Sequence, residues 1–133
     1  MSRPADVGSL KKGHHILIKN EPCRIVEYER SKPGKHGSAK ARIVAIGIFD
    51  EGKRSIVSPV SAKISVPIIE KRSAQIISMT EKSVQLMDLE NYEIFFASIP
   101  NKKELEGKLS TGLEIEFWKI LDRIKIMRIK GST

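Results

Sequence analysis

Two apolar runs flank one basic loop in the stretch CRIVEYERSKPGKHGSAKARIVAIGIF, residues 23–49. In the runs Cys23 to Arg30 and Lys40 to Phe49, apolar and polar side chains largely alternate, a pattern typical of half-buried β-strands. The loop between them, Ser31 to Lys40, contains no large apolar side chain that could anchor it in a core. The stretch therefore predicts a β-hairpin whose loop projects from the body of the protein.

Similar short runs continue on both sides of this hairpin. In the first half of the chain, the further candidate strands are His14 to Ile18, Ser55 to Val60 and Ile64 to Ile69. Turn-forming residues separate the strands, namely Lys19-Asn20-Glu21-Pro22, Asp50-Glu51-Gly52 and Pro59. Five short strands in about 60 residues predict a small, strongly bent barrel.

The second half repeats this β pattern with one interruption. Its candidate strands are Ala74 to Met79, Val84 to Leu89, Glu93 to Ile99, Leu113 to Leu121 and Arg123 to Lys130. The insert at residues 101–107 is the one good helix candidate, because Asn101 suits a helix cap, Glu104 completes a capping box and Gly107 suits a helix end. Three strands, a short helix and two strands form the order of an oligonucleotide-binding barrel, the OB-fold. We therefore expect an all-β protein of two small barrels, the second an OB-fold with one short helix.

The charge balance changes around Pro67 to Arg72, where a fresh series of strands begins. Residues 1–69 hold 13 basic and 6 acidic side chains, whereas residues 70–133 hold 11 and 10. We therefore expect two domains, residues 1–69 and residues 70–133. Because the junction contains no Gly or Ser tract, the linker should be short.

The whole chain is basic, with 24 Lys and Arg against 16 Asp and Glu, a net charge of +8 and a pI near 9.7. A basic excess concentrated in one half points to nucleic acid as a partner, although basic surfaces also serve solubility. No run approaches the roughly 18 apolar residues of a membrane span, and the start lacks an apolar secretion signal, so we expect a cytoplasmic protein without a membrane segment. The single Cys23 cannot form an internal disulfide, and we interpret it as a small buried side chain.

Positive charge gathers in and beside the loop. Between positions 30 and 42 the sequence has five cations and no carboxylate, namely Arg30, Lys32, Lys35, Lys40 and Arg42, with His36 beside them. Pro33 and Gly34 suit the central positions of a type II turn, and Gly37 frees the descending arm. Such lysines are often simply solvated, but a segment without its own counter-charge also suits contact with phosphate groups.

Other kinds of site find no support in the sequence. A nucleotide-binding loop requires a Gly five residues before the pair Gly34-Lys35 and a Ser or Thr after it, whereas Glu29 and His36 occupy these positions. The chain has no Ser/His/Asp set, no paired-carboxylate motif and no metal-ligand spacing, and no Cys or carboxylate cluster accompanies His14-His15. We therefore expect no catalytic residue, no metal site and no enzyme activity.

The stretch Ser31 to Lys40 resembles the modification loop of translation initiation factor 5A, the hypusine-containing family related to bacterial elongation factor P. The resemblance extends over nearly the whole chain, through Pro22 to Glu27, Ile46 to Phe49, and Val66-Pro67 at the domain junction. It implies an SH3-like barrel followed by an OB-fold, in agreement with the strand count above. It also implies that Lys35 receives an aminobutyl group from spermidine through deoxyhypusine synthase. In many members, hydroxylation then converts this deoxyhypusine to hypusine.

The same resemblance implies a function. A member of this family would bind the ribosome beside peptidyl-tRNA, and its modified Lys35 would promote peptide-bond formation where synthesis stalls, notably at consecutive prolines. Recognition of the modification loop would involve Pro33, Gly34, His36, Gly37 and Ser38. Contacts with RNA or the ribosome would involve Arg30, Lys32, Lys40 and Arg42. No cofactor is implied beyond the covalent modification, and we expect a monomer.

Two features resemble archaeal members of the family. Pro33 and Ser38 stand where eukaryotic relatives usually have Thr and His, and the amino-terminal extension is very short. Because archaeal members often stop at deoxyhypusine, the sequence leaves open whether the final hydroxylation takes place.

A second hypothesis is an RNA-binding or structural ribosomal protein of two barrels that acts unmodified. Aromatic residues make up only 5% of the chain, and those of the second half fall in strand runs where core packing explains them. The residues concerned are Tyr92, Phe95, Phe96, Phe117 and Trp118. We therefore expect no stacking platform for single-stranded nucleic acid, and the modification state of Lys35 separates the two hypotheses.

Overall fold

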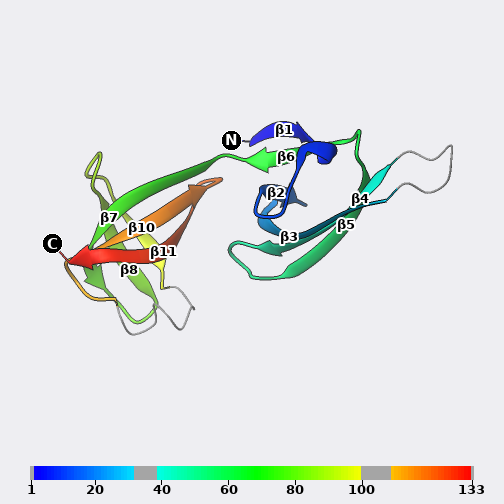
Figure 1. The fold of residues 1–133 in the computed structure, drawn as a ribbon. Coiled ribbons are helices and arrows are strands. Elements are labelled where there is room, and N and C mark those ends of the chain that lie inside the picture. The colour runs from blue at the N-terminus through cyan, green and yellow to red at the C-terminus, as the bar shows by residue number, and fades with distance from the viewer. Residues whose placement is uncertain (1, 32–38, 100–108, 133) are drawn as a thin grey trace. The chain divides into compact units, whose positions relative to one another are not determined.

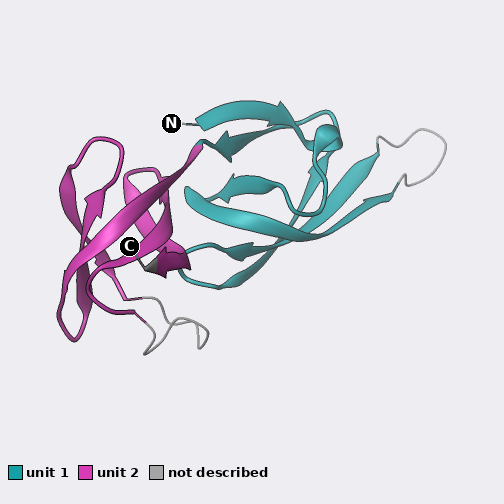
Figure 2. Ribbon diagram, turned by 60° about the vertical axis from the view of Figure 1, so that its left-hand side comes forward, with its two compact units in different colours: residues 1–68 teal, residues 69–133 magenta. Residues whose placement is uncertain are grey.

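The structure of the protein, a computed structural model, describes residues 2–31, 39–99 and 109–132. These residues are mostly in strands, and a 3-10 turn, η1 (Val7–Ser9), is the one helical element among them (Figure 1). The chain divides into two compact units, Met1–Ile68 and Ile69–Thr133 (Figure 2). The expected all-β fold of two small barrels is confirmed. The helix expected at residues 101–107 lies outside the described residues.

The first unit is built from an antiparallel sheet and a two-stranded ribbon. Its described strands are β1 (Ser2–Asp6), β2 (His15–Ile18), β3 (Glu21–Ser31), β4 (Lys40–Gly47), β5 (Lys53–Pro59) and β6 (Lys63–Pro67). β2 to β5 pair in chain order, and β1 pairs with β6. Alternate side chains of the sheet and the residues around η1 form one core, made of Val7, Leu10, Ile16, Ile18, Cys23, Ile25, Ala41, Ile43 and Ala45.

The sequence pattern did not predict β1. Its residues contain no alternation of apolar side chains, and they become a strand by pairing with β6, where Ala5 lies opposite Ile64. An ion pair joins Lys63 to Asp6, 57 positions apart in sequence. Because a distant partner creates this strand, no local pattern indicates it.

The second unit is a single five-stranded sheet in the part of the chain that the structure describes. Its strands are β7 (Ile69–Met79), β8 (Ser83–Asp88), β9 (Ile94–Ser98), β10 (Leu113–Ile120) and β11 (Arg123–Ser132). The order β11-β10-β7-β8-β9 brings the fourth strand back beside the first, and β9 also approaches β11, so the sheet curls into a barrel. β7 begins before the expected Ala74 because residues 69–73 pair with β10.

Two hairpins of the protein turn through residues with positive φ. Lys19 and Asn20 have φ of 51° and 66° between β2 and β3, and Leu121 and Asp122 have φ of 50° and 64° between β10 and β11. Two-residue loops with positive φ at both positions are type I′ turns, whose twist matches that of the flanking strands. Asn and Asp tolerate this conformation well, whereas Lys19 and Leu121 adopt it at a steric cost.

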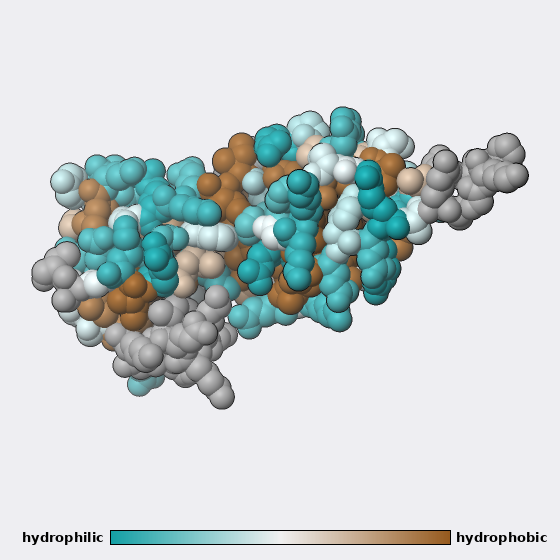
Figure 3. Space-filling view, viewed as in Figure 1, coloured by the Kyte–Doolittle hydropathy of each residue, from teal (hydrophilic) through white to brown (hydrophobic). Residues whose placement is uncertain are grey.

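Hydrophobic residues reach the largely hydrophilic surface in places (Figure 3). The large hydrophobic residues that are exposed in the described part are Val57, Ile68, Met79, Tyr92, Ile94 and Phe96. The expected core packing is confirmed for Phe117, which is buried and lies 5.1 Å from the ring of Phe95. It is wrong for Tyr92 and Phe96, which are 68% and 66% exposed. No helix among the described residues is long and apolar enough to cross a membrane.

Candidate functional site: the β3–β4 hairpin

β3 and β4 form the antiparallel hairpin that the sequence predicted around the basic loop. Their pairing runs from Cys23 opposite Gly47 to Ser31 opposite Lys40, with one irregularity between Ile25 and Glu27. The described chain stops at Ser31 and resumes at Ala39, at the far end of the two strands in Figure 1. The predicted site residues that lie outside the described residues are Lys32, Pro33, Gly34, Lys35, His36, Gly37 and Ser38. Their roles stay predictions.

Backbone hydrogen bonds fix the point from which the loop departs. The Val60 N–H donates to the Ala39 carbonyl, and the Gly8 N–H donates to the Val60 carbonyl, each at 3.0 Å. On β5, Pro59 lies opposite Lys40. The segment that follows β5 thus ties η1 to the start of β4.

β3 also holds η1, through two side chains that point to one face. The Tyr28 hydroxyl donates to the Val7 carbonyl at 2.8 Å, and Arg30 Nη2 donates to the Gly8 carbonyl at 3.3 Å. A Cβ at Gly8 would lie 2.8 Å from that guanidinium nitrogen, so the glycine allows the close approach. Arg30, expected to contact RNA, therefore also has a structural contact within its own unit.

Lys40 and Arg42 lie on the other face of the hairpin. Side chains alternate along a strand, and both residues are exposed, whereas Ala41, which pairs with Arg30, is buried. Arg42 Nη1 lies 3.8 Å from Glu29 Oε2 in an exposed cross-strand ion pair. Residues 30–42 contain no carboxylate, but Glu29 lies directly before them and pairs with Arg42. The hairpin therefore does contain a counter-charge near the loop. Exposed pairs of this kind contribute little stability, which leaves Arg42 able to exchange Glu29 for another anion.

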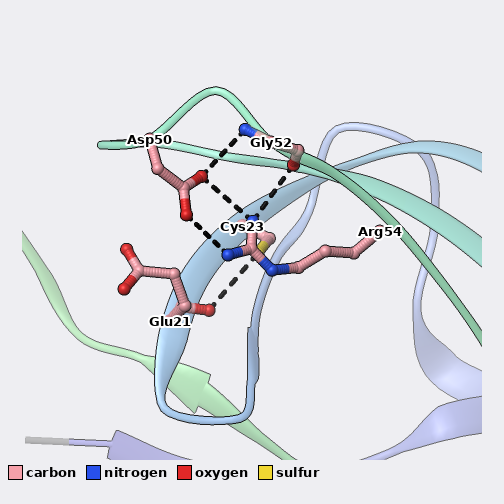
Figure 4. A network of polar contacts seen from close by, with 5 residues as sticks. All are labelled: Glu21, Cys23, Asp50, Gly52 and Arg54. Carbon is pink, nitrogen blue, oxygen red and sulfur yellow. Dashed lines mark hydrogen bonds and ion pairs between the residues drawn. The ribbon is translucent and has the colours of Figure 1, made fainter.

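The opposite end of the hairpin is closed by a polar network around Asp50 and Arg54 (Figure 4). Asp50 Oδ1 accepts hydrogen bonds from the Gly52 N–H at 2.8 Å and from Arg54 Nη1 at 3.0 Å, and Arg54 Nη1 also donates to the Gly52 carbonyl at 3.1 Å. The hydrogen bond with Asp50 raises the pKa of Arg54. A Cβ at Gly47 would lie 2.0 Å from Asp50 Oδ1, so this network requires glycine at that position.

Cys23 lies beside this network and is fully buried. Its thiol donates to the Glu21 carbonyl at 3.3 Å, and burial raises its pKa although Arg54 acts in the opposite sense. A thiol with a raised pKa is a poor nucleophile. The interpretation of Cys23 as a small buried side chain is confirmed.

The described residues contain no group of three or more His, Cys, Asp and Glu side chains that could hold a metal ion.

Two antiparallel barrels, the first with a long hairpin that leads to a basic loop, define a class of all-β proteins in which an SH3-like domain precedes an OB-fold. Comparison with known families and structures makes the assignment more specific.

Two family models match the chain. Residues 1–62 match "Translation initiation factor 5A-like, N-terminal", and residues 68–130 match "Eukaryotic elongation factor 5A hypusine, DNA-binding OB fold". Among curated relatives, translation initiation factor 5A of Thermofilum pendens is 52% identical over 130 residues, covering 98% of each chain. That of Thermococcus onnurineus is 56% identical over 128 residues, covering 95% of this chain and 94% of the relative.

Solved structures agree with this match. Translation initiation factor 5A from Methanococcus jannaschii superposes with a TM-score of 0.88 at 43% identity, covering 96% of this chain and 94% of that one. A family protein from Naegleria fowleri gives a TM-score of 0.79 at 31% identity, covering 97% and 98%. This chain belongs to the translation initiation factor 5A family.

Proposed function

We propose that the protein binds the ribosome beside peptidyl-tRNA and promotes peptide-bond formation at stalled sequences, notably consecutive prolines, through a deoxyhypusine or hypusine at Lys35. The observation that carries the proposal is the sequence Gly34-Lys35-His36, placed between β3 and β4 of a chain that belongs to the hypusine-containing family. The factor would present Lys35 from the first unit, and deoxyhypusine synthase would modify it.

The chemistry of the modification supports this role. An unmodified lysine carries one ammonium group on a flexible stem. An aminobutyl group from spermidine lengthens the stem and adds a second amine, so the side chain reaches further and carries more positive charge. In a cleft lined by RNA phosphates, such a group can hold the acceptor end of a tRNA in a productive geometry. The ribosome would perform the chemistry, and this protein would supply orientation and charge rather than catalysis.

The described part of the hairpin fits a supporting role for its cations. Lys40 and Arg42 are exposed on the face away from η1, where they can contact the phosphate backbone without reading sequence. Arg30 lies on the other face and donates to Gly8, so we give it the additional role of fixing the base of the loop. Lys32 keeps its predicted role as a phosphate contact, and we propose that the protein acts as a monomer.

The first test is the intact mass of the protein from its native host, with peptide mapping across residues 31–40. We expect a spermidine-derived aminobutyl or hydroxyaminobutyl adduct on Lys35. A fully unmodified Lys35 would contradict the proposal and favour the plain RNA-binding alternative.

The second test replaces the acceptor amine. Lys35→Arg keeps the positive charge but removes the group that deoxyhypusine synthase modifies, so the variant should fold normally and fail to support growth in place of the native protein. Lys32→Arg is the matched control, because it makes the same change three positions away and should be tolerated. Full growth with Lys35→Arg would refute the modified-lysine hypothesis.

A further inference from the structure

The interior of the second barrel is charged at one end. Core-facing side chains alternate along a strand, and next to the buried ones on β7, β8 and β10 the following core-facing positions are ionisable. They are Arg72 before Ala74, Asp88 after Leu86 and Lys119 after Phe117. Glu70 lies one core-facing position further out on β7. The apolar core of this unit therefore ends in charged side chains.

A pocket of about 120 Å³ lies at this end of the barrel. Phe95, Phe117 and Ile124 form its apolar part, and the two rings lie 5.1 Å apart. Its ionisable lining consists of Glu70, Arg72, Asp88, Glu93 and Lys119. An apolar pocket on which a few polar groups converge has the usual form of a binding site.

Acidic side chains outnumber basic ones around the pocket. Arg72 lies within ion-pair distance of three carboxylates, which are Asp88 at 2.8 Å, Glu90 at 3.0 Å and Glu70 at 3.6 Å. Glu93 is exposed and makes no ion pair with another described residue. With Lys119 included, these four carboxylates and two cations give a net charge of −2. The pocket therefore attracts a cation.

The size of the pocket indicates which cation. A volume of about 120 Å³ is well below the roughly 300–1,000 Å³ of sites for whole small molecules, and close to the roughly 150 Å³ of a cavity that holds one benzene molecule. A guanidinium group and the methylene beside it contain about five non-hydrogen atoms, which this space can hold. Guanidinium groups pair with carboxylates through two hydrogen bonds and stack on aromatic rings, and the pocket offers both kinds of partner.

Exposed apolar side chains beside the pocket indicate that the guanidinium belongs to a protein. Tyr92 lies between Asn91 and Glu93, which both line the pocket, and it is 68% exposed, while Ile94 is 57% exposed. The Tyr92 N–H donates to the Asp88 carbonyl at 2.8 Å, which fixes the turn that carries the ring. A protein would cover these two side chains, whereas a free cation would leave them in water. Arginine and aromatic residues are enriched in protein interfaces, and the negative charge of the pocket repels nucleic acid.

We infer that this pocket binds an arginine side chain of a partner protein. Glu70 and Glu93 hold the guanidinium group, and Phe95 and Phe117 contact its stem. The surface around that arginine packs against Tyr92 and Ile94. The inference goes beyond the proposed function, since it concerns described residues of the second unit and a different kind of partner.

The test adds N-acetyl-arginine amide to the full protein, labelled for NMR, and follows the backbone amide shifts. We expect shifts at the residues that line the pocket and a dissociation constant in the millimolar range, because one side chain binds without the rest of its protein. N-acetyl-citrulline amide is the matched control ligand, since it keeps the shape of arginine but has no charge. It should bind about tenfold more weakly or less, because hydrogen bonds between charged groups are stronger.

Two variants change the charge of the pocket in opposite directions. Glu93→Gln removes a partner of the guanidinium and should weaken binding about threefold, whereas Lys119→Gln removes a repelling cation and should strengthen binding about threefold. Glu81→Gln is the matched control variant, because it removes the same charge from the turn between β7 and β8, at the other end of these strands, and should leave binding unchanged.

Three results would overturn the inference. The first is the absence of shifts at the pocket, or equal binding of the arginine and citrulline compounds. The second is weaker binding in both Glu93→Gln and Lys119→Gln, because charge would then not explain the effect. The third is binding of free agmatine more than tenfold tighter than that of N-acetyl-arginine amide, because the pocket would then hold a small free cation. None of these outcomes depends on the tests of Lys35.

Discussion

Asp88 is the one buried charged side chain among the described residues, and its replacement tests what holds the turn before β9. The residue is 4% exposed, and its carboxylate accepts the N–H groups of Glu90 at 2.8 Å and Asn91 at 3.4 Å, beside the ion pair with Arg72. Asp88→Ala removes every one of these contacts. Asp88→Asn keeps an oxygen that can still accept from the turn but removes the charge.

The expected loss follows from the geometry. A hydrogen bond to a charged group contributes about 1.5–3 kcal/mol, so the short bond from Glu90 accounts for about 2 kcal/mol and the long one from Asn91 for about 1 kcal/mol. Arg72 keeps Glu90 and Glu70 as partners, so we assign no further loss to it. Asp88→Ala should therefore lower the free energy of unfolding by about 3 kcal/mol, and Asp88→Asn by about 1 kcal/mol.

The effect should depend on pH in a defined direction. Burial alone would raise the pKa of Asp88, but the Glu90 N–H and the Arg72 guanidinium outweigh it and hold the pKa below its ordinary value of 3.8. The stability from this depression is present above that value and is lost as the pH falls through the lower folded value. Native protein and Asp88→Asn should therefore differ most near neutral pH and converge in acid.

The assay is urea unfolding followed by tryptophan fluorescence. The chain has one tryptophan, Trp118 on β10, so the signal reports the second unit. Glu70→Gln is the control, because Glu70 lies 3.6 Å from Arg72 with a 52% exposed side chain and should contribute little. A loss below about 1 kcal/mol for Asp88→Ala, or equal losses for Asp88→Ala and Glu70→Gln, would refute the reasoning.

Four further substitutions test the first unit and the β10–β11 turn. Gly47→Ala should lower the free energy of unfolding by about 1–3 kcal/mol, because its methyl group would collide with Asp50. Gly47 lies in the first unit, so unfolding in urea is followed by circular dichroism, and a midpoint unchanged from native would contradict the prediction. Leu121→Asn should raise the thermal stability by about 0.5–1 kcal/mol, since Asn accepts the φ of 50° at lower cost; a lower melting temperature would count against the type I′ turn. Arg30→Met should speed hydrogen exchange around η1, because it removes the hydrogen bond to the Gly8 carbonyl. Arg42→Gln should leave this exchange unchanged and reduce the salt slope of RNA binding by about 0.7. Faster exchange in Arg42→Gln with native exchange in Arg30→Met would exclude the assigned roles.

Local alternation was sufficient to predict most strands but not those created by distant pairing. The apolar runs of β3 and β4 lie where the pattern predicted strands, because their alternate side chains are buried in one core. β1 has no such pattern and depends on β6. The start of β7 was also missed, since residues 69–73 are held by β10, far along the chain.

The aromatic residues of the second half show what composition alone cannot decide. Aromatic residues in strands usually pack in a core, which holds for Phe95 and Phe117. The adjacent pair Phe95-Phe96 carries a signal that could have corrected the prediction, because a period of two sends one ring outward. The exposure of Tyr92 had no comparable signal, since its turn depends on the hydrogen bonds of Asp88.

The contact of Arg30 could not be predicted from the sequence either, because its partner is the backbone carbonyl of Gly8. This contact shows that one arm of the hairpin is held in place near the loop. If positive charge alone carried the function, the arms that lead to the loop would need no fixed position. Instead, η1 and Val60 fix the end near the loop, and the network of Asp50 and Arg54 closes the other end. A functional group acts with precision only when rigid elements hold its attachment points. A variant that frees η1 should therefore impair the function even with Lys35 fully modified, whereas loss of one exposed cation should mainly weaken binding.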